Sequence, residues 1–248
     1  MTQILTPLEL AGCIEHRAEG ALTRDRVEKL CREADELGFG AVSVPSAWVS
    51  FARRSLLGTR VKLSTTIGFP YGDQQPRAKF EEARAAVELG ASEISFMLND
   101  TYALDGPESL WQEQRNLQGV IRACCEIRST TMKVLINVTT LTRDEFARLV
   151  LMVLETHVDF IGIFSASDGR HNIGIDPIDG LRPLIGNQAN ILVWNDELDQ
   201  MKDGSSEGPI DVRHGFALSF LEHGAKRLVT TRGPGILHTA RQLAARTG

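Results

Sequence analysis

Strand-like and helix-like segments alternate along the chain, and this alternation restricts the fold more than any other feature of the sequence. A β-rich run and a helical run recur roughly every 30 residues, which is the size of one strand–helix unit. Residues 24–38 carry the apolar stripe of a helix, whereas residues 158–167 begin as a nearly continuous apolar run. Continuous apolar strands are typical of parallel sheets that are covered on both faces.

Eight such units are present when a short first strand is counted, and no break in composition divides them. The predicted strands cover residues 12–16, 40–45, 60–70, 91–99, 132–141, 158–167, 191–196 and 226–235. A barrel of eight βα units needs about 250 residues, and the chain has 248. We therefore predict an α/β protein that forms one (β/α)8 TIM barrel over residues 1–248. An open, doubly wound sheet is the alternative.

Charge and composition narrow the classes of partner. The net charge is −5 and the basic residues are scattered, which argues against nucleic acid and anionic membranes as partners. No apolar run approaches the roughly 20 residues of a membrane span, and the first residues lack a signal-peptide pattern. The four cysteines show no CxxC spacing, and the neighbouring Cys124 and Cys125 are expected to be buried small hydrophobes. We expect a cytoplasmic protein that binds a small molecule.

Several motifs resemble the deoxyribose-phosphate aldolase family. They are "IEH", "VKLSTTIGFPYG", "AKFEEARAAVELGASEISFMLN", "MKVLIN", "DFIG" and "HGAKRLVTTRG", and they occur in this order between Leu10 and Leu237. The resemblance implies the barrel fold and a carbon–carbon bond-forming or bond-cleaving activity through a Schiff base on a lysine. It also implies self-association, and the apolar helix surface could support a homodimer.

The resemblance implies that the covalent chemistry of the family is lost. The family's Schiff-base lysine on strand six falls on Gly162, and its strand-four aspartate falls on Ser95. The activating lysine on strand seven falls near Trp194 or Asn195, the first-strand aspartate on Glu15, and the strand-five glutamate on Asn137. A lysine nucleophile needs a lowered pKa, and glycine cannot replace it.

Other lysines could in principle take over this role. Lys29, Lys79 and Lys226 lie on or beside predicted helices and are expected to be solvated. Lys133 opens a strand, about 13 Å below the catalytic end at roughly 3.3 Å per residue. Lys202 lies in the loop after strand seven. A Schiff-base aldolase with Lys133 or Lys202 as the relocated lysine therefore remains one alternative.

The ends of the predicted strands supply the remaining candidates, because TIM-barrel active sites form there. The loop "TTRGPG" after strand eight could bind an anion, either phosphate or carboxylate, through Thr230, Thr231, Arg232 and the amides near Gly233, although Pro234 removes one amide donor. Asp196 and Glu197, in a long loop that could form a lid, are candidate general acids or bases. Other strand-end candidates are Ser43, Thr65, Thr66, Ser165, Asp168, His171, Trp194 and Asn195.

Histidines beside carboxylates form a further group of candidates. His16 with Glu15, and His171 with Asp168, could transfer protons. None has the spacing of a metal site, and we predict neither a metal nor a cofactor. Phe96, Ile163, Phe164 and Trp194 are expected near the barrel mouth, where they favour a ligand with a flat or apolar part.

The sequence thus predicts a diverged enzyme that acts on a small carbonyl-containing metabolite. The strand-eight loop suits an anionic substrate. Its catalytic residues would be Glu15, His16, Ser95, Asn137, Asp196 and Glu197. Acid–base catalysis without a Schiff base would make it a lyase of the aldolase type, a cyclase or an isomerase. A binding or regulatory pseudoenzyme without turnover is the other alternative.

Overall fold

The computed structural model describes residues 5–18, 20–139, 141–164, 175–194 and 212–247. Within these ranges, parallel strands pair in the order β1 to β8, and β8 pairs with β1 to close the barrel. The predicted (β/α)8 TIM barrel is confirmed, and the open sheet is wrong. Closure satisfies the backbone groups that an open sheet would leave at its edges.

The strands are β1 (Ile14–Arg17), β2 (Ala41–Ser43), β3 (Lys62–Ile67), β4 (Glu93–Met97), β5 (Thr131–Asn137), β6 (Phe160–Phe164), β7 (Asn190–Trp194) and β8 (Ala225–Thr230). The helices are α1 (Pro7–Gly12), α2 (Arg24–Leu37), the short 3₁₀ helix η1 (Ser46–Trp48), α3 (Val49–Ser55), α4 (Pro76–Glu88), α5 (Thr101–Asp105), α6 (Pro107–Ile127), α7 (Arg143–Leu154), α8 (Asp176–Ile185), α10 (Val212–Glu222) and α11 (Gly233–Thr247).

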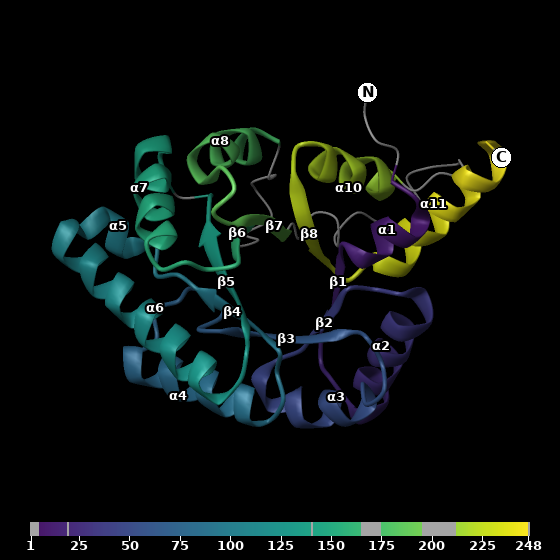
Figure 1. The fold of residues 1–248 in the computed structure, drawn as a ribbon, viewed down its shortest axis with the longest axis horizontal. Coiled ribbons are helices and arrows are strands. Elements are labelled where there is room, and N and C mark those ends of the chain that lie inside the picture. Colours follow the sequence, from purple (N-terminus) through teal and green to yellow (C-terminus); the bar gives the residue numbers. More distant parts are fainter. Residues whose placement is uncertain (1–4, 19, 140, 165–174, 195–211, 248) are drawn as a thin grey trace.

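The helices form a ring outside the strands, and α1 packs beside α11 near the point where the barrel closes (Figure 1). Local sequence explains several helix starts. Thr142 and Glu145 form a capping box at the start of α7, and Thr6 and Glu9 form a second one at α1. The helix α1 was not predicted, because it has only 6 residues and too few apolar positions to show a period.

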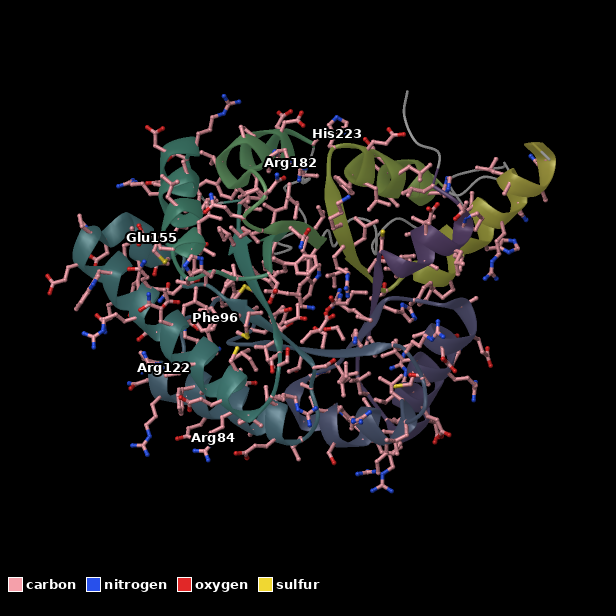
Figure 2. The ribbon with its side chains drawn as sticks, in the orientation of Figure 1. Arg84, Phe96, Arg122, Glu155, Arg182 and His223 are labelled. Carbon is pink, nitrogen blue, oxygen red and sulfur yellow. The ribbon has the colours of Figure 1, made fainter. Side chains whose placement is uncertain are left out.

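Apolar side chains from the outer faces of the strands pack against the helices. Phe96 and Ile163 belong to this layer, as Figure 2 shows for Phe96 inside the helix ring. Arg84 and Arg122, by contrast, lie on exposed positions of α4 and α6. The expectation that Phe96 and Ile163 line the barrel mouth is wrong, because alternate residues of a strand face opposite sides of the sheet.

No helix in the part of the chain that the structure describes is both long and apolar enough to cross a membrane.

The cysteines differ in exposure although none forms a disulfide. Cys31 and Cys124 are buried, Cys13 is partly buried, and Cys125 is exposed. The expectation of buried cysteines therefore holds for Cys124 and is wrong for Cys125. Burial raises the pKa of the Cys31 thiol to about 11 and that of the Cys124 thiol to about 12.

We predict that iodoacetamide at pH 8 labels Cys125 first and leaves Cys31 and Cys124 unmodified in the folded protein. Only the thiolate reacts, and the two buried thiols are protonated at this pH. Peptide mass spectrometry after timed quenching measures the labelling, and protein unfolded in guanidinium provides the control in which all cysteines react. Labelling of Cys124 as fast as Cys125 would contradict the burial.

Candidate functional site

The inner face of the barrel is identified by side chains that meet across it. Lys133 of β5 contacts Glu15 of β1 and Glu93 of β4, which is possible only inside the barrel. Alternation along β1 then places Arg17 inside with Glu15 and turns His16 outward. Glu15 and His16 therefore cannot form the proton-transfer pair that the sequence suggested.

An ion-pair network fills the interior near the N-terminal ends of the strands. The Lys133 ammonium donates to Glu15 Oε2 at 2.6 Å, to Ser64 Oγ at 2.8 Å and to Glu93 Oε2 at 2.9 Å, and its side chain is 0% exposed. The Arg227 guanidinium lies 3.3 Å from Glu93 and 3.6 Å from Glu15. Two carboxylates thus face two cations, and the buried charges are balanced.

This balance determines the protonation of Glu93. Burial raises the pKa of its carboxyl group, but the charges of Lys133 and Arg227 outweigh burial and lower the pKa overall. Glu93 is therefore ionised in the folded protein at neutral pH. Its contribution to stability is present above the pKa of the unfolded chain, about 4.3 for glutamate, and is lost as the pH falls through the lower folded pKa.

An apolar cluster lies beyond the network, toward the C-terminal ends of the strands. Its buried members are Met97, Leu135, Phe164, Leu192, Trp194 and Val229. Gly162 lies among them on the inner face of β6, paired in register with Leu135 and Leu192. A Cβ atom at position 162 would approach Leu135 Cδ2 to 2.5 Å and Leu192 Cδ2 to 2.9 Å. Leucine side chains thus occupy the space above this glycine.

Aromatic rings cover this cluster at the barrel mouth. Trp194 stacks on Phe69 with ring centroids 5.6 Å apart, and it meets Phe164 edge-on at 4.9 Å. Phe69 comes from the loop between β3 and α4, so the rings join this loop to β6 and β7. The Arg17 guanidinium lies 5.0 Å from the centre of a Trp194 ring, within the range of a cation–π contact.

A cavity of 290 Å³ opens beside these rings, above the ends of β1, β2 and β3. We call it the mouth cavity. Its lining combines an apolar wall with polar groups, which is typical of small-molecule sites. The described residues that line it are Arg17, Ala18, Ser43, Val44, Pro45, Ser46, Thr66, Phe69, Gln74, Glu82 and Trp194.

Glu82 of α4 holds two loops around the mouth cavity. Its Oε1 accepts a hydrogen bond from Ser46 Oγ at 2.8 Å, and its Oε2 accepts one from the Gly68 amide at 3.2 Å. Glu82 is the only carboxylate among the described lining residues. It therefore brings a negative charge, and the Ser46 hydroxyl that donates to it, to the lining of the mouth cavity.

A buried ion pair supports the loop that carries Phe69. Lys79 donates to Glu113 Oε1 at 2.9 Å and to the Gly72 carbonyl at 2.9 Å, and Glu113 also accepts from the Asn99 amide. The expectation that Lys79 is solvated is wrong, since its exposure is 1%. Lys79 turns inward because the loop and α6 supply both of its partners.

A second, smaller cavity lies between β1, α2 and the end of β8, with a volume of 160 Å³. We call it the β1–α2 cavity. Its lining contains Arg17 and Ala18, which the mouth cavity shares, and His16, Leu22, Arg26, Lys29, Leu30, Glu33 and Thr231. His16 is buried there with Nε2 3.5 Å from Glu33, and its Nδ1 lies 3.4 Å from the Thr230 carbonyl oxygen.

Sequence comparison with other proteins identifies the family of this chain. No protein-family model matches the chain. The deoxyribose-phosphate aldolase of Methanothermobacter thermautotrophicus is 30% identical over 230 residues, covering 92% of this chain and 94% of the relative. The chain belongs to the deoxyribose-phosphate aldolase family. The enzyme of this name from Geobacillus sp. is 29% identical over 233 residues, with 92% and 94% of the two chains covered.

Solved aldolase structures share the fold. The aldolase QR15 superposes with a TM-score of 0.79 at 22% identity, covering 96% of this chain and 97% of its own. The deoxyribose-phosphate aldolase of Aeropyrum pernix, described as a unique tetramer, has a TM-score of 0.78 at 20% identity and coverage of 96% and 93%. The likeness at this level of identity establishes the barrel.

The candidates inferred from the resemblance to the deoxyribose-phosphate aldolase family lie in different places. Trp194 lines the mouth cavity, whereas Glu15 belongs to the ion-pair network. Ser95 is buried on the inner face of β4 and does not line the mouth cavity. Asn137, at the end of β5, accepts hydrogen bonds from the amide and hydroxyl of Thr139.

The candidate residues at the end of strand eight also lie in different places. Thr231 lines the β1–α2 cavity, but Thr230 lies on the outer side of β8 and accepts from the Arg232 amide at 3.0 Å. Gly233 starts α11 against Ile14 and Phe39, where an added Cβ would come within 3.0 Å of both. Close packing therefore accounts for this glycine. Ser165, Asp168, His171, Asn195, Asp196, Glu197 and Lys202 lie outside the described residues.

Arg17 and Glu82 were missed from the sequence. Arg17 follows Glu15 at the spacing of one strand face, so strand alternation could have identified it. Glu82 sits inside a helix, where nothing in the sequence shows that its carboxylate reaches two loops. No group of three His, Cys, Asp or Glu side chains among the described residues is arranged to hold a metal ion.

We predict that Lys133→Met lowers the free energy of unfolding by about 3–5 kcal/mol at pH 7, because it leaves buried carboxylates without their ammonium partner. Without Lys133, burial favours protonated carboxyls, so the loss should be smaller at pH 5 than at pH 7. Urea denaturation at both pH values measures this.

Lys226→Met provides the matched control. Lys226 is exposed and adjoins the network residue Arg227 in the sequence, so its loss should change stability by no more than about 0.5 kcal/mol. A Lys133→Met variant that is equally destabilised at both pH values would contradict the role of the ammonium in keeping the carboxylates ionised.

Proposed function

We propose that this chain is a lyase of the aldolase type that acts on a small carbonyl-containing metabolite by acid–base catalysis, without a Schiff base. The observation that carries the proposal is the composition of the mouth cavity. Its described lining has a guanidinium, a carboxylate and several hydroxyl groups, and it has no lysine. Membership of the deoxyribose-phosphate aldolase family supports the class of reaction.

The positions of the lysines support the absence of a Schiff base. Gly162 stands where the resemblance puts the family's nucleophile, and leucine side chains fill the space beside it. The ammonium groups of Lys133 and Lys79 are buried in ion pairs with carboxylates, and neither lysine lines the mouth cavity. Lys29, Lys62 and Lys226 are exposed and lie outside the mouth cavity. Lys202 lies outside the described residues.

Arg17 and Glu82 are suited to complementary roles in such a reaction. When a carbon–carbon bond next to a carbonyl breaks, negative charge develops on the carbonyl oxygen, and a fixed guanidinium stabilises that charge. Arg17 is positioned for this by its contact with Trp194. Glu82 can accept the proton of the substrate hydroxyl directly or through Ser46, which already donates to it. Asp196 and Glu197 remain proposed acid–base groups in the loop after β7.

One observation favours a binding or regulatory pseudoenzyme as the second candidate. Phe69, Phe164 and Trp194 cover the centre of the barrel mouth, so the mouth cavity lies to one side of the barrel axis. A ligand could bind there without reaching a group that reacts. The tetrameric relative from Aeropyrum pernix supports self-association of this chain as well.

We predict that borohydride reduction in the presence of short aldehydes gives no stable adduct with the native protein, because no lysine lines the mouth cavity among the residues that the structure describes. Intact-protein mass spectrometry detects an adduct as a defined mass increase. The Geobacillus relative serves as the control that should become trapped. A stoichiometric adduct on Lys133 or Lys202 would establish the relocated-lysine alternative instead.

We predict that Glu82→Gln lowers kcat for aldol cleavage by about 10²–10⁴-fold, the usual contribution of a general base. Glu88→Gln, at the exposed end of the same helix, should leave kcat unchanged. A panel of β-hydroxy aldehydes and ketones, with release of the aldehyde followed by coupled reduction, measures the rate. Saturable binding of these compounds with no turnover by the unaltered protein would favour the pseudoenzyme.

A further inference from the structure

We propose that the substrate carries a planar aromatic ring on its hydroxyl-bearing carbon, and that Phe69 determines this specificity as the wall of the mouth cavity on which the ring packs. The inference rests on the proposed function and adds the substrate class, which is a β-hydroxy carbonyl compound whose cleavage releases an aromatic aldehyde. It concerns the half of the substrate that lies beside Glu82.

The ring of Phe69 is only partly covered in the protein. Phe69 lines the mouth cavity and is 48% exposed, although burying a large apolar side chain is favourable. Its ring lies nearly parallel to that of Trp194, at an interplanar angle of 7°, so one face of Phe69 packs on this neighbour. The rest of its apolar surface is open to a ligand in the cavity.

The backbone around Phe69 is fixed by side chains that line the same cavity. The Gly68 amide donates to Glu82 Oε2 at 3.2 Å, and the Phe69 carbonyl accepts from Gln74 Nε2 at 3.2 Å. Both Glu82 and Gln74 belong to the lining of the mouth cavity. A wall that is held in place before binding takes up a ligand at a small cost in conformational entropy.

The mouth cavity has the size and the apolar lining for an aromatic ring. An engineered apolar cavity of about 150 Å³ binds benzene in another protein. The mouth cavity has 290 Å³, which leaves space for a short polar chain, and Ala18, Val44 and Pro45 add aliphatic surface to it. Aromatic rings gain from offset-stacked or edge-to-face contacts with one another, so Phe69 favours a planar ring over an aliphatic group of similar size.

The contacts of Glu82 indicate which half of the substrate bears the ring. Glu82 accepts from the amide of Gly68, the residue before Phe69, so its carboxylate and the aromatic ring belong to the same part of the wall. The hydroxyl whose proton Glu82 accepts would then stand on the carbon that bears the substrate ring. Arg17 contacts Trp194 and suits the carbonyl half.

The cleavage of such a substrate balances without a further reactant. The hydroxyl proton moves to Glu82, the hydroxyl-bearing carbon becomes the carbonyl carbon of the aromatic aldehyde, and the bond from this carbon to its neighbour breaks. The electron pair of that bond enters the enolate of the second product, whose oxygen lies beside Arg17. The proton on Glu82 then returns to the enolate carbon and gives a neutral ketone or aldehyde.

Titration calorimetry with two ketones that lack the hydroxyl group tests the ring preference on the unaltered protein. Acetophenone and cyclohexyl methyl ketone have equal numbers of carbon atoms, but only acetophenone has a planar ring. We expect acetophenone to bind about 2–10-fold more tightly, the usual worth of an aromatic pair. A merely apolar cavity would prefer the more apolar cyclohexyl compound. Equal affinities, the reverse preference, or no saturable binding of either ketone would overturn the proposal.

Variants test the assignment to Phe69. Phe69→Leu removes the ring but keeps an apolar side chain, so the preference for acetophenone should disappear, whereas Phe69→Tyr should retain it. Phe216→Leu is the matched control, because Phe216 is 42% exposed and lies outside the described lining of the mouth cavity. It should bind both ketones as the unaltered protein does. A preference that survives Phe69→Leu in a folded variant would overturn the role of Phe69, and the ketone comparison itself needs no variant.

Turnover separates this inference from the proposed function. The aldol of benzaldehyde and acetone should be cleaved with a higher kcat/KM than the aldol of acetaldehyde and acetone, and Phe69→Leu should reduce this ratio mainly through KM. A preference for acetophenone in a protein that cleaves neither aldol would retain the aromatic site and remove the proposed catalytic function. Cleavage of both aldols with equal kcat/KM would retain the catalytic function and remove the specificity.

Discussion

The Lys133 ammonium is the interaction on which the interior of this barrel depends. It donates to side chains from β1, β3 and β4, so one charged group joins strands that are distant in sequence. A charge so deeply buried is tolerated only with charged partners, and Glu15, Glu93 and Arg227 complete the balance. The same contacts hold Glu15 and Lys133 in the interior network, and neither residue is part of the described lining of the mouth cavity.

The layer beyond this network shapes the space at the barrel mouth. Leu135 and Leu192 fill the space beside Gly162, and the rings of Phe69, Phe164 and Trp194 close the centre of the mouth. The remaining space lies toward β1, β2 and β3, where Arg17 and Glu82 provide opposite charges. The buried Lys79–Glu113 pair holds the loop that carries Phe69, so the wall of the cavity is itself supported by a second desolvated ion pair.

Strand ends were the most informative part of the sequence for the site. Ser43, Thr66 and Trp194 were expected at the mouth because parallel strands end on one side of the barrel, and all three line the mouth cavity. Residue spacing gave the wrong environment for side chains whose partners come from distant segments of the chain. Helix position alone suggested that Lys79 is solvated, but Glu113 and the Gly72 carbonyl are supplied by other segments. Likewise, proton transfer was predicted between the adjacent Glu15 and His16, but strand alternation places their side chains on opposite sides of the sheet.

The sequence by itself determined the barrel, because hydrophobic periodicity is local and each strand–helix unit carries its own pattern. It also determined that position 162 bears no side chain, and therefore that no nucleophile can stand there. Only the tertiary structure decided which charges are buried and paired, how the aromatic rings cover the mouth, and that Arg17 lies between two cavities. These properties depend on distances between residues from different strands and helices, and those distances exist only after the barrel has closed.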